Sequence, residues 1–186
     1  MDQTGHPLVV TGVPPDYFSV TGQRWGNPHY QWESMQADGF QWWINRMATQ
    51  FALFDVVRID HFRGFESCWE IPEQNPTAEG GQWIKVPGDA LFDALCKKFS
   101  ALPLVAEDLG IITPEVDALR EKYHLPGMKI LQFAFEGGPT NPYLPHNHKK
   151  DSVHPRLVPG IILSRAKLHY GISGQTAGIH ALAIDT

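Results

Sequence analysis

Two acidic side chains, each at the end of a predicted strand, are the residues of this sequence best suited to chemistry. Asp60 ends the β-branched segment 56–60, and Glu107 follows the apolar segment 102–106. Side chains alternate along a strand, so Arg58 shares a face with Asp60 and would lower the pKa of its carboxyl group. An ionised carboxylate at the C-terminal end of a strand is typical of a nucleophile in an α/β barrel. A structural ion pair at a strand end is the alternative.

Two carboxyl groups on neighbouring strand ends suit the cleavage of a glycosidic bond. One carboxylate attacks the anomeric carbon, while the other carboxyl group protonates the leaving oxygen and later deprotonates the incoming one. A retaining mechanism needs the two groups about 5–5.5 Å apart. Glu107 would have to stay protonated, either through burial or through a nearby acid such as Asp108.

A metal site is the competing interpretation of the same region. Oxygen and nitrogen atoms that could bind a metal ion are present in four residues: Asp60, His61, Glu107 and Asp108. Arg58 counts against a metal, because a cation beside a ligand carboxylate repels the ion. The sequence also lacks an H-E-x-x-H pattern. We therefore expect neither a metal ion nor another cofactor.

The segments around the two acids alternate between helix and strand. Helical spacing of apolar residues predicts three helices: 38–54, 89–99 and 113–123. Asp38 and Thr113 are the expected N-caps of the first and third helices. Buried apolar runs predict three strands: 56–60, 102–106 and 128–135. Three successive helix–strand steps indicate an α/β protein with a parallel sheet.

Residues 1–37 and 65–88 contain many glycines, prolines and aromatic residues and show no helical periodicity. We expect both segments to be long ordered loops, because disordered segments contain few aromatic residues. Aromatic loops suit the recognition of a flat-faced ligand such as a sugar ring. Packing of the rings back onto the domain is the alternative.

The composition argues against several other classes of protein. The 186 residues carry a formal net charge of −5 and form no basic stripe, so nucleic acid is not an expected partner. No apolar run approaches the ~20 residues of a membrane span, and residues 1–5 lack the features of a signal peptide. Cys68 and Cys96 follow no metal or redox spacing, and we expect reduced thiols in a cytoplasmic protein.

Five segments together resemble the amylomaltase family of 4-α-glucanotransferases, which is related to the α-amylase superfamily of barrel enzymes. They are, in family order, G-V-P-P-D-Y-F-S (12–19), G-Q-R-W-G-N-P (22–28), R-I-D-H-F-R-G-F (58–65), A-E-D-L-G (106–110) and L-P-G-M-K-I-L-Q-F-A-F (125–135). The resemblance implies a fragment of a (β/α)8 TIM barrel that contains about the fourth to sixth strands, with long aromatic-bearing loops.

The resemblance also implies a reaction and roles for individual residues. Asp60 would form a covalent glucosyl-enzyme, and Glu107 would be the general acid/base. The expected substrate-binding residues are Arg58, His61, Tyr17, Phe18, Gln23, Trp25, Asp108 and Phe133. The reaction would be a retaining double displacement that moves a segment of a 1,4-α-D-glucan to a new 4-hydroxyl. The expected partners are malto-oligosaccharides and α-1,4-glucans.

The resemblance ends near residue 148. Residues 149–186 lack the family's T-H-D-N-D segment, which carries a third carboxylate, and we expect them to be a divergent tail of frame-shifted or non-native origin. The family's first three barrel strands would precede residue 1. We therefore expect residues 1–148 to form a partial catalytic barrel that is inactive or weakly active alone. The alternatives are a non-catalytic glucan-binding remnant and an α-glucan hydrolase of the same superfamily.

Overall fold

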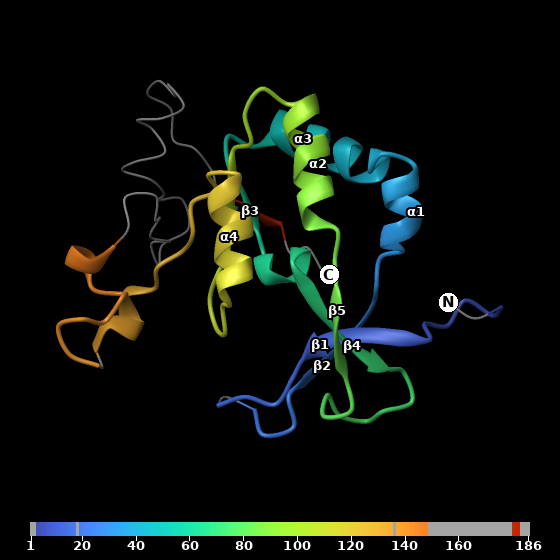
Figure 1. Cartoon of the computed structure of the whole chain (residues 1–186), viewed down its shortest axis with the longest axis horizontal. Coiled ribbons are helices and arrows are strands. Elements are labelled where there is room, and N and C mark those ends of the chain that lie inside the picture. Colours follow the sequence, from blue (N-terminus) through green and yellow to red (C-terminus); the bar gives the residue numbers. More distant parts are fainter. Residues whose placement is uncertain (1–2, 18, 136, 149–179, 183–186) are drawn as a thin grey trace.

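The computed structural model describes residues 3–17, 19–135, 137–148 and 180–182 of the chain. The described part contains two β-sheets and several helices. In Figure 1 a four-stranded antiparallel sheet lies at the bottom, and a short parallel sheet lies above it, next to the helices.

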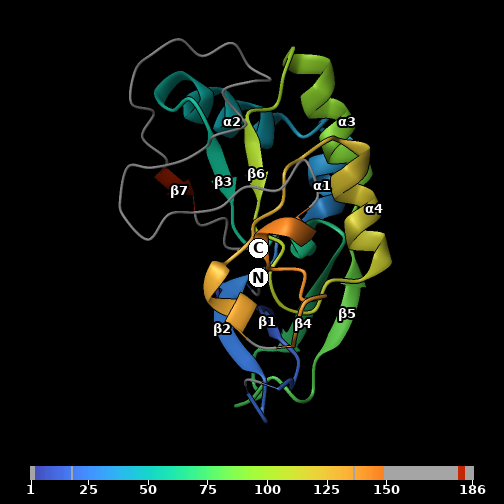
Figure 2. The same ribbon diagram turned by 90° about the vertical axis from the view of Figure 1, so that its left-hand side faces the viewer.

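The parallel sheet has the strand order β6-β3-β7. Its strands are β3 (Val57–Ile59), β6 (Leu104–Ala106) and β7 (His180–Leu182). β3 pairs in parallel with β6, with Arg58 opposite Val105, and in parallel with β7 on its other side. Figure 2 shows β3 and β6 side by side. The strands predicted over 56–60 and 102–106 are confirmed.

Three helices agree with the predicted ones, and a short fourth was not predicted. They are α1 (Trp32–Ala37, unpredicted), α2 (Gln41–Leu53), α3 (Gly88–Lys98) and α4 (Pro114–Lys122). Thr113 is the N-cap of α4, as predicted. The N-cap of α2 is Phe40 rather than Asp38, although Asp38 accepts a hydrogen bond from the N–H of Gln41 at 3.2 Å. Within the described ranges, no helix is long and apolar enough to span a membrane.

One apolar core joins the helices to one face of the parallel sheet. Val57 and Ile59 belong to this core. Other fully buried members come from α2, α3 and the turn η1 (Phe62–Phe65): Trp43, Met47, Phe62, Phe65, Leu91, Phe92 and Leu95. Arg58 alternates with Val57 and Ile59, so it points to the opposite face. On that face Val105 and Met128 belong to a separate, smaller cluster.

The strand predicted over 128–135 is wrong. Met128 makes only an isolated bridge, and the chain then forms the 3-10 turn η2 (Leu131–Phe135), none of whose residues is buried. The N–H of Met128 donates to the carboxylate of Asp108 at 2.7 Å, so it is not available for a backbone ladder. The neighbour of β3 on the side away from β6 is β7. An apolar run alone cannot reveal such competition for a backbone donor.

The long loops predicted over 1–37 and 65–88 are also wrong, because they contain an antiparallel sheet with the order β2-β1-β4-β5. Its strands are β1 (Val9–Val13), β2 (Gln23–Pro28), β4 (Ser67–Pro72) and β5 (Gln82–Lys85). The register of β1 and β2 shifts between Val10 and Gly12. A Cβ at Gly12 would lie 2.1 Å from the carbonyl oxygen of Gln23. This glycine therefore permits close strand contact rather than breaking a strand.

Candidate active site

The acids predicted to carry the chemistry, Asp60 and Glu107, are the first residues after β3 and β6. The parallel ladder continues into this region, because the N–H of Glu107 donates to the carbonyl of Ile59 at 2.8 Å. Arg58 and Val105 are register partners on one face of the sheet. Asp60 and Glu107 each lie two residues further along the chain, so their side chains project from that same face. The structure thus brings the two acids together at the C-terminal ends of neighbouring strands.

Asp60 forms an ion pair with Arg58. The Nη2 of Arg58 donates to Oδ1 of Asp60, and its Nε donates to the sulfur of Met128 at 3.3 Å. The side chains of Arg58 and Asp60 are 26% and 39% exposed. A carboxylate that keeps this much open surface can be reached by a ligand while it remains paired with the guanidinium.

The carboxyl group of Glu107 is held by backbone donors beside Asp60. The N–H groups of His61 and Leu109 each donate to one of its oxygens at 2.9 Å. Burial raises the pKa of the Glu107 carboxyl group. The two N–H donors lower this pKa, and the charge of Asp60 raises it further. The nearby acid that acts on Glu107 is therefore Asp60, in place of the Asp108 considered above. An ion-paired carboxylate beside a carboxyl group of raised pKa suits a nucleophile and a general acid.

His61 connects the two acids to the antiparallel sheet. Its backbone is left-handed, with φ 47° and ψ 53°, which is uncommon for a residue other than glycine. Its ring meets the ring of Trp25 edge to face, with centroids 4.8 Å apart. The indole N–H of Trp25 donates to the side-chain oxygen of Gln23 at 3.1 Å. Three predicted substrate-binding residues thus form one contact chain beside Asp60.

We expect the imidazole of His61 to remain neutral down to low pH. Burial, and then the guanidinium of Arg63, lower the pKa of His61 from 6.5 to about 4. Between these pH values the unfolded chain binds a proton that the folded chain does not. The free energy of unfolding should therefore fall as the pH drops from 6.5 towards 4.

Two measurements check the titration of His61. An NMR titration of the ring should give a midpoint far below 6.5. The substitution His61→Asn should flatten this part of the pH dependence of urea unfolding. A midpoint near 6.5 for His61 would contradict the placement of its ring.

The structure places Asp108 within the fold rather than in an open site. Its side chain is 7% exposed, and Oδ2 forms an ion pair with Nε of Arg120 at 3.3 Å. The other oxygen accepts the hydrogen bond from Met128. A Cβ at Gly127 would lie 2.1 Å from Oδ2. Asp108 therefore anchors the turn at 126–128, and both of its oxygens are engaged inside the protein.

The predicted aromatic residues of the first loop are only partly described. Tyr17 lies in the turn between β1 and β2, where the N–H of Asp16 donates to the carbonyl of Ser19. The Tyr17 side chain is 95% exposed. Phe18 lies outside the described residues.

Phe133 lies in η2 and is 46% exposed, next to an aromatic residue that the sequence did not single out. Its ring packs edge to face on Tyr143, with centroids 5.3 Å apart. Burial, followed by the charges of Asp108 and Glu107, raises the pKa of Tyr143. Tyr143 therefore links Phe133 to the vicinity of Glu107. Its position between two prolines, in N-P-Y-L-P, was the available signal.

The described residues offer no group of metal-binding side chains to support the competing interpretation as a metal site. In the part of the chain that is described, no three His, Cys, Asp or Glu side chains are grouped to hold a metal ion. Arg58 and Arg120 are instead paired with two of the four candidate ligands, Asp60 and Asp108. Cys68 and Cys96 are free thiols.

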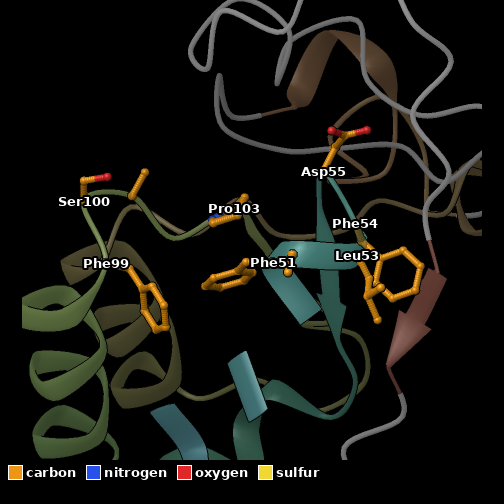
Figure 3. A pocket seen from close by; sticks show the side chains of 9 residues that line it. Phe51, Leu53, Phe54, Asp55, Phe99, Ser100 and Pro103 are labelled. Carbon is orange, nitrogen blue, oxygen red and sulfur yellow. The ribbon is translucent and has the colours of Figure 1, made fainter. Parts of the chain in front are cut away.

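A pocket lies at the opposite ends of the two strands (Figure 3). It is lined by residues that precede β3 and β6: Phe51, Ala52, Leu53, Phe54, Asp55, Phe99, Ser100, Ala101 and Pro103. Asp60 and Glu107 instead follow these strands. The pocket is therefore separate from the candidate active site.

Known proteins resemble this chain in both sequence and fold. A family model described as 4-alpha-glucanotransferase matches residues 1–155, which is most of the chain. The chain belongs to the 4-alpha-glucanotransferase family. The resemblance to amylomaltases found in the motifs is thereby confirmed.

Several 4-alpha-glucanotransferases are close relatives. The protein of Thermus thermophilus is 56% identical over 158 residues, which are 85% of this chain and 31% of the relative. The protein of Synechocystis is 55% identical over 147 residues, 78% of this chain and 29% of the relative. The chain thus spans about a third of the length of the relatives it matches.

Solved structures of amylomaltases agree with the fold. The amylomaltase from Streptococcus agalactiae, solved in complex with acarbose, has a TM-score of 0.80 and 39% identity, covering 83% of this chain and 31% of that one. The amylomaltase from Corynebacterium glutamicum has a TM-score of 0.70 at 22% identity, covering 90% of this chain and 24% of that one. The mixed α/β fold of this 4-alpha-glucanotransferase family member is therefore the amylomaltase fold over the matched part.

Proposed function

We propose that this chain carries the bond-cleaving centre of a 4-α-glucanotransferase, with Asp60 as nucleophile and Glu107 as general acid/base. The observation that carries the proposal is the placement of the two residues. They follow neighbouring parallel strands on one face, and the N–H of His61, next to Asp60, binds the Glu107 carboxylate. The raised pKa of Glu107 and the Arg58 ion pair at Asp60 give the two groups different chemical tasks.

The reaction would proceed by two displacements. The Asp60 carboxylate attacks the anomeric carbon of the donor, the bond from that carbon to the bridging oxygen breaks, and Glu107 gives its proton to that oxygen. A glucosyl ester on Asp60 results. The 4-hydroxyl of an acceptor glucan then attacks the same carbon, its proton passes to Glu107, and the Asp60 carboxylate leaves. Neither step needs a metal ion or another cofactor.

Aromatic side chains would favour a sugar hydroxyl over water as the acceptor. Trp25 and Phe133 are 39% and 46% exposed, so their rings can stack on the C–H faces of glucose units and exclude water. Tyr17, Phe18 and Gln23 are proposed to contribute to the same acceptor side, and Asp108 indirectly through its contacts. The proposed substrates are malto-oligosaccharides and α-1,4-glucans. The solved complex of the Streptococcus agalactiae relative with acarbose supports this class of ligand.

The fold supports a partial barrel as the setting of the site. We propose that residues 1–148 are part of a (β/α)8 catalytic barrel in which β3 and β6 are about the fourth and fifth strands. Residues 149–186 would be a divergent tail. Because the chain spans 31% of the first relative, the remaining strands of such a barrel would lie outside it. The isolated chain is therefore expected to be weakly active or inactive. Its free thiols suit the reducing cytoplasm as its location.

A glucan-binding remnant is the second candidate function. The observation that favours it is that the contact chain of Gln23, Trp25 and His61 lies wholly within this part of the fold. Such a contact chain could bind sugar without the rest of a catalytic barrel. Binding without turnover would then be the biological property of the chain.

A chimaeric enzyme separates these possibilities. Residues 1–148 of this chain would replace the matching segment of the Thermus thermophilus relative, and the isolated 186-residue chain would be assayed in parallel with maltotriose. We expect the chimaera to produce glucose and longer malto-oligosaccharides while the number of reducing ends stays constant. A rising number of reducing ends would indicate a hydrolase, and glucan binding without products would indicate the remnant.

A further inference from the structure

Arg63 is a buried cation close to the candidate active site, and it is not among the residues predicted to carry the chemistry or to bind substrate. It lies in η1, three residues after Asp60, and only 8% of its surface is exposed. Burying a guanidinium is costly unless its donors are paired. In the described part of the structure, its buried Nε has no hydrogen-bond partner. The other groups of the guanidinium do have partners.

The contacts of Arg63 reach three separate elements. Its Nη1 donates to the carbonyl of Ile111 at 2.8 Å, and its Nη2 donates to the hydroxyl of Ser67 on β4 at 3.4 Å. The guanidinium also lies over the ring of Trp83 on β5, 3.9 Å from its centroid. A planar fork that donates in two directions and stacks on a ring is specific to arginine.

One of these contacts bears directly on the spacing of the acids. Arg63 follows Asp60 by three residues, and Ile111 follows Glu107 by four. The hydrogen bond between Arg63 and Ile111 therefore joins the segment after β3 to the segment after β6. The contacts to Ser67 and Trp83 fix the same guanidinium to the antiparallel sheet.

We propose that Arg63 is a positioning residue that fastens the segment 60–65 to the segment 107–111 and thereby sets the placement of Asp60 relative to Glu107. This inference rests on the proposed function. We place Arg63 outside the site that a sugar would occupy, because its Nη donors are engaged by a backbone carbonyl and a hydroxyl and its plane lies over the Trp83 ring. Arg63 affects the reaction only by holding the two acid-bearing segments in place.

The first test measures transfer from maltotriose in the chimaera. Arg63→Ala should lower kcat by about 10- to 100-fold, since a displacement of about 1 Å between reacting groups has effects of this size, while KM changes less than about threefold. Arg63→Lys should not restore kcat, because an ammonium cannot form the fork or stack in the same plane. Added methylguanidinium should partly restore kcat in Arg63→Ala.

A matched control separates positioning from general stability. Arg46, on α2, also lies over an aromatic ring, 5.0 Å from the centroid of Trp42, and it donates a hydrogen bond to the hydroxyl of Tyr30 rather than to either acid-bearing segment. Arg46→Ala should leave kcat and its response to methylguanidinium unchanged. If Arg63→Ala does not fold, Trp83→Leu removes one of the three contacts of Arg63 and should lower kcat in the same direction, by less.

The second test does not depend on activity. Hydrogen exchange of the backbone amides at 107–112 should become faster in Arg63→Ala and slow again with methylguanidinium. Faster exchange in a chimaera without transfer activity would overturn the proposed function and leave the fastening role in place. The inference is overturned if exchange at 107–112 is unchanged, or if Arg63→Lys is as active as the parent.

Discussion

Replacing Glu107 by glutamine in the chimaera should slow transfer from maltotriose by about 10²–10⁴-fold, the usual contribution of a positioned general acid. The amide cannot give a proton to the leaving oxygen. The raised pKa of Glu107, caused mainly by burial, keeps more of this carboxyl group protonated near neutral pH than in an exposed glutamate. In the parent, the rate of the first displacement should fall as the pH rises above the pKa of Glu107. This basic limb should disappear in Glu107→Gln.

The choice of donor shows whether the missing proton is the cause. With α-glucosyl fluoride the leaving group needs little protonation, so formation of the glucosyl-enzyme should be slowed much less than with maltotriose. Glu115→Gln, in a fully exposed residue of α4, serves as the control and should leave both rates unchanged. Equal losses with both donors would show that Glu107 is not the general acid.

Replacing Gly127 by alanine should lower the free energy of unfolding by about 2–4 kcal/mol, in the range of substitutions that disrupt a buried ion pair. The new Cβ would lie 2.1 Å from Oδ2 of Asp108, so the carboxylate must move. That movement disturbs the ion pair with Arg120 and the hydrogen bond from Met128. Met128 also accepts the hydrogen bond from Arg58, so the disturbance should reach Asp60 and lower kcat as well.

Urea unfolding of the chain and of the chimaera measures this effect. Gly138→Ala is the matched control, because its Cβ would meet nothing within 4 Å although its φ is +74°. It should cost only about 1 kcal/mol of backbone strain. If Gly127→Ala is no more destabilising than Gly138→Ala, the close packing of this turn on Asp108 is not important for stability.

Local patterns predicted two of the three strands of the parallel sheet and the helices that pack on it. The apolar runs before Asp60 and Glu107 are strands, and the helical spacing around Trp43 and Leu95 corresponds to α2 and α3. These elements are fixed by residues close in the sequence, so periodicity reveals them. The antiparallel sheet depends on pairing between distant segments, such as Thr11 with Glu70. Single-segment patterns contain no information on such pairing, and the segment 1–37, which contains Gly12, was therefore predicted as a loop.

The orientation of a site residue could be predicted where its position in a strand decides from which face its side chain projects. Alternation along the strand predicted that Arg58 and Asp60 share a face, and the expected pairing of neighbouring strands placed Glu107 beside Asp60. Asp108 was not predictable in this way, because its partner Arg120 lies on a helix and its direction depends on tertiary contacts. Arg63 was missed for the same reason, since its partners lie in segments far from it in the sequence.

The location of the covalent sugar tests the central claim most directly. A fluorinated glucosyl fluoride, which forms the ester readily and loses it slowly, would be incubated with the chimaera, and the protein would be digested and analysed by mass spectrometry. We predict one added fluoroglucosyl group, carried by Asp60 and absent in Asp60→Asn. A label on any other residue, or no label in a chimaera that turns over maltotriose, would contradict the claim that Asp60 attacks across the same linkage that Glu107 protonates.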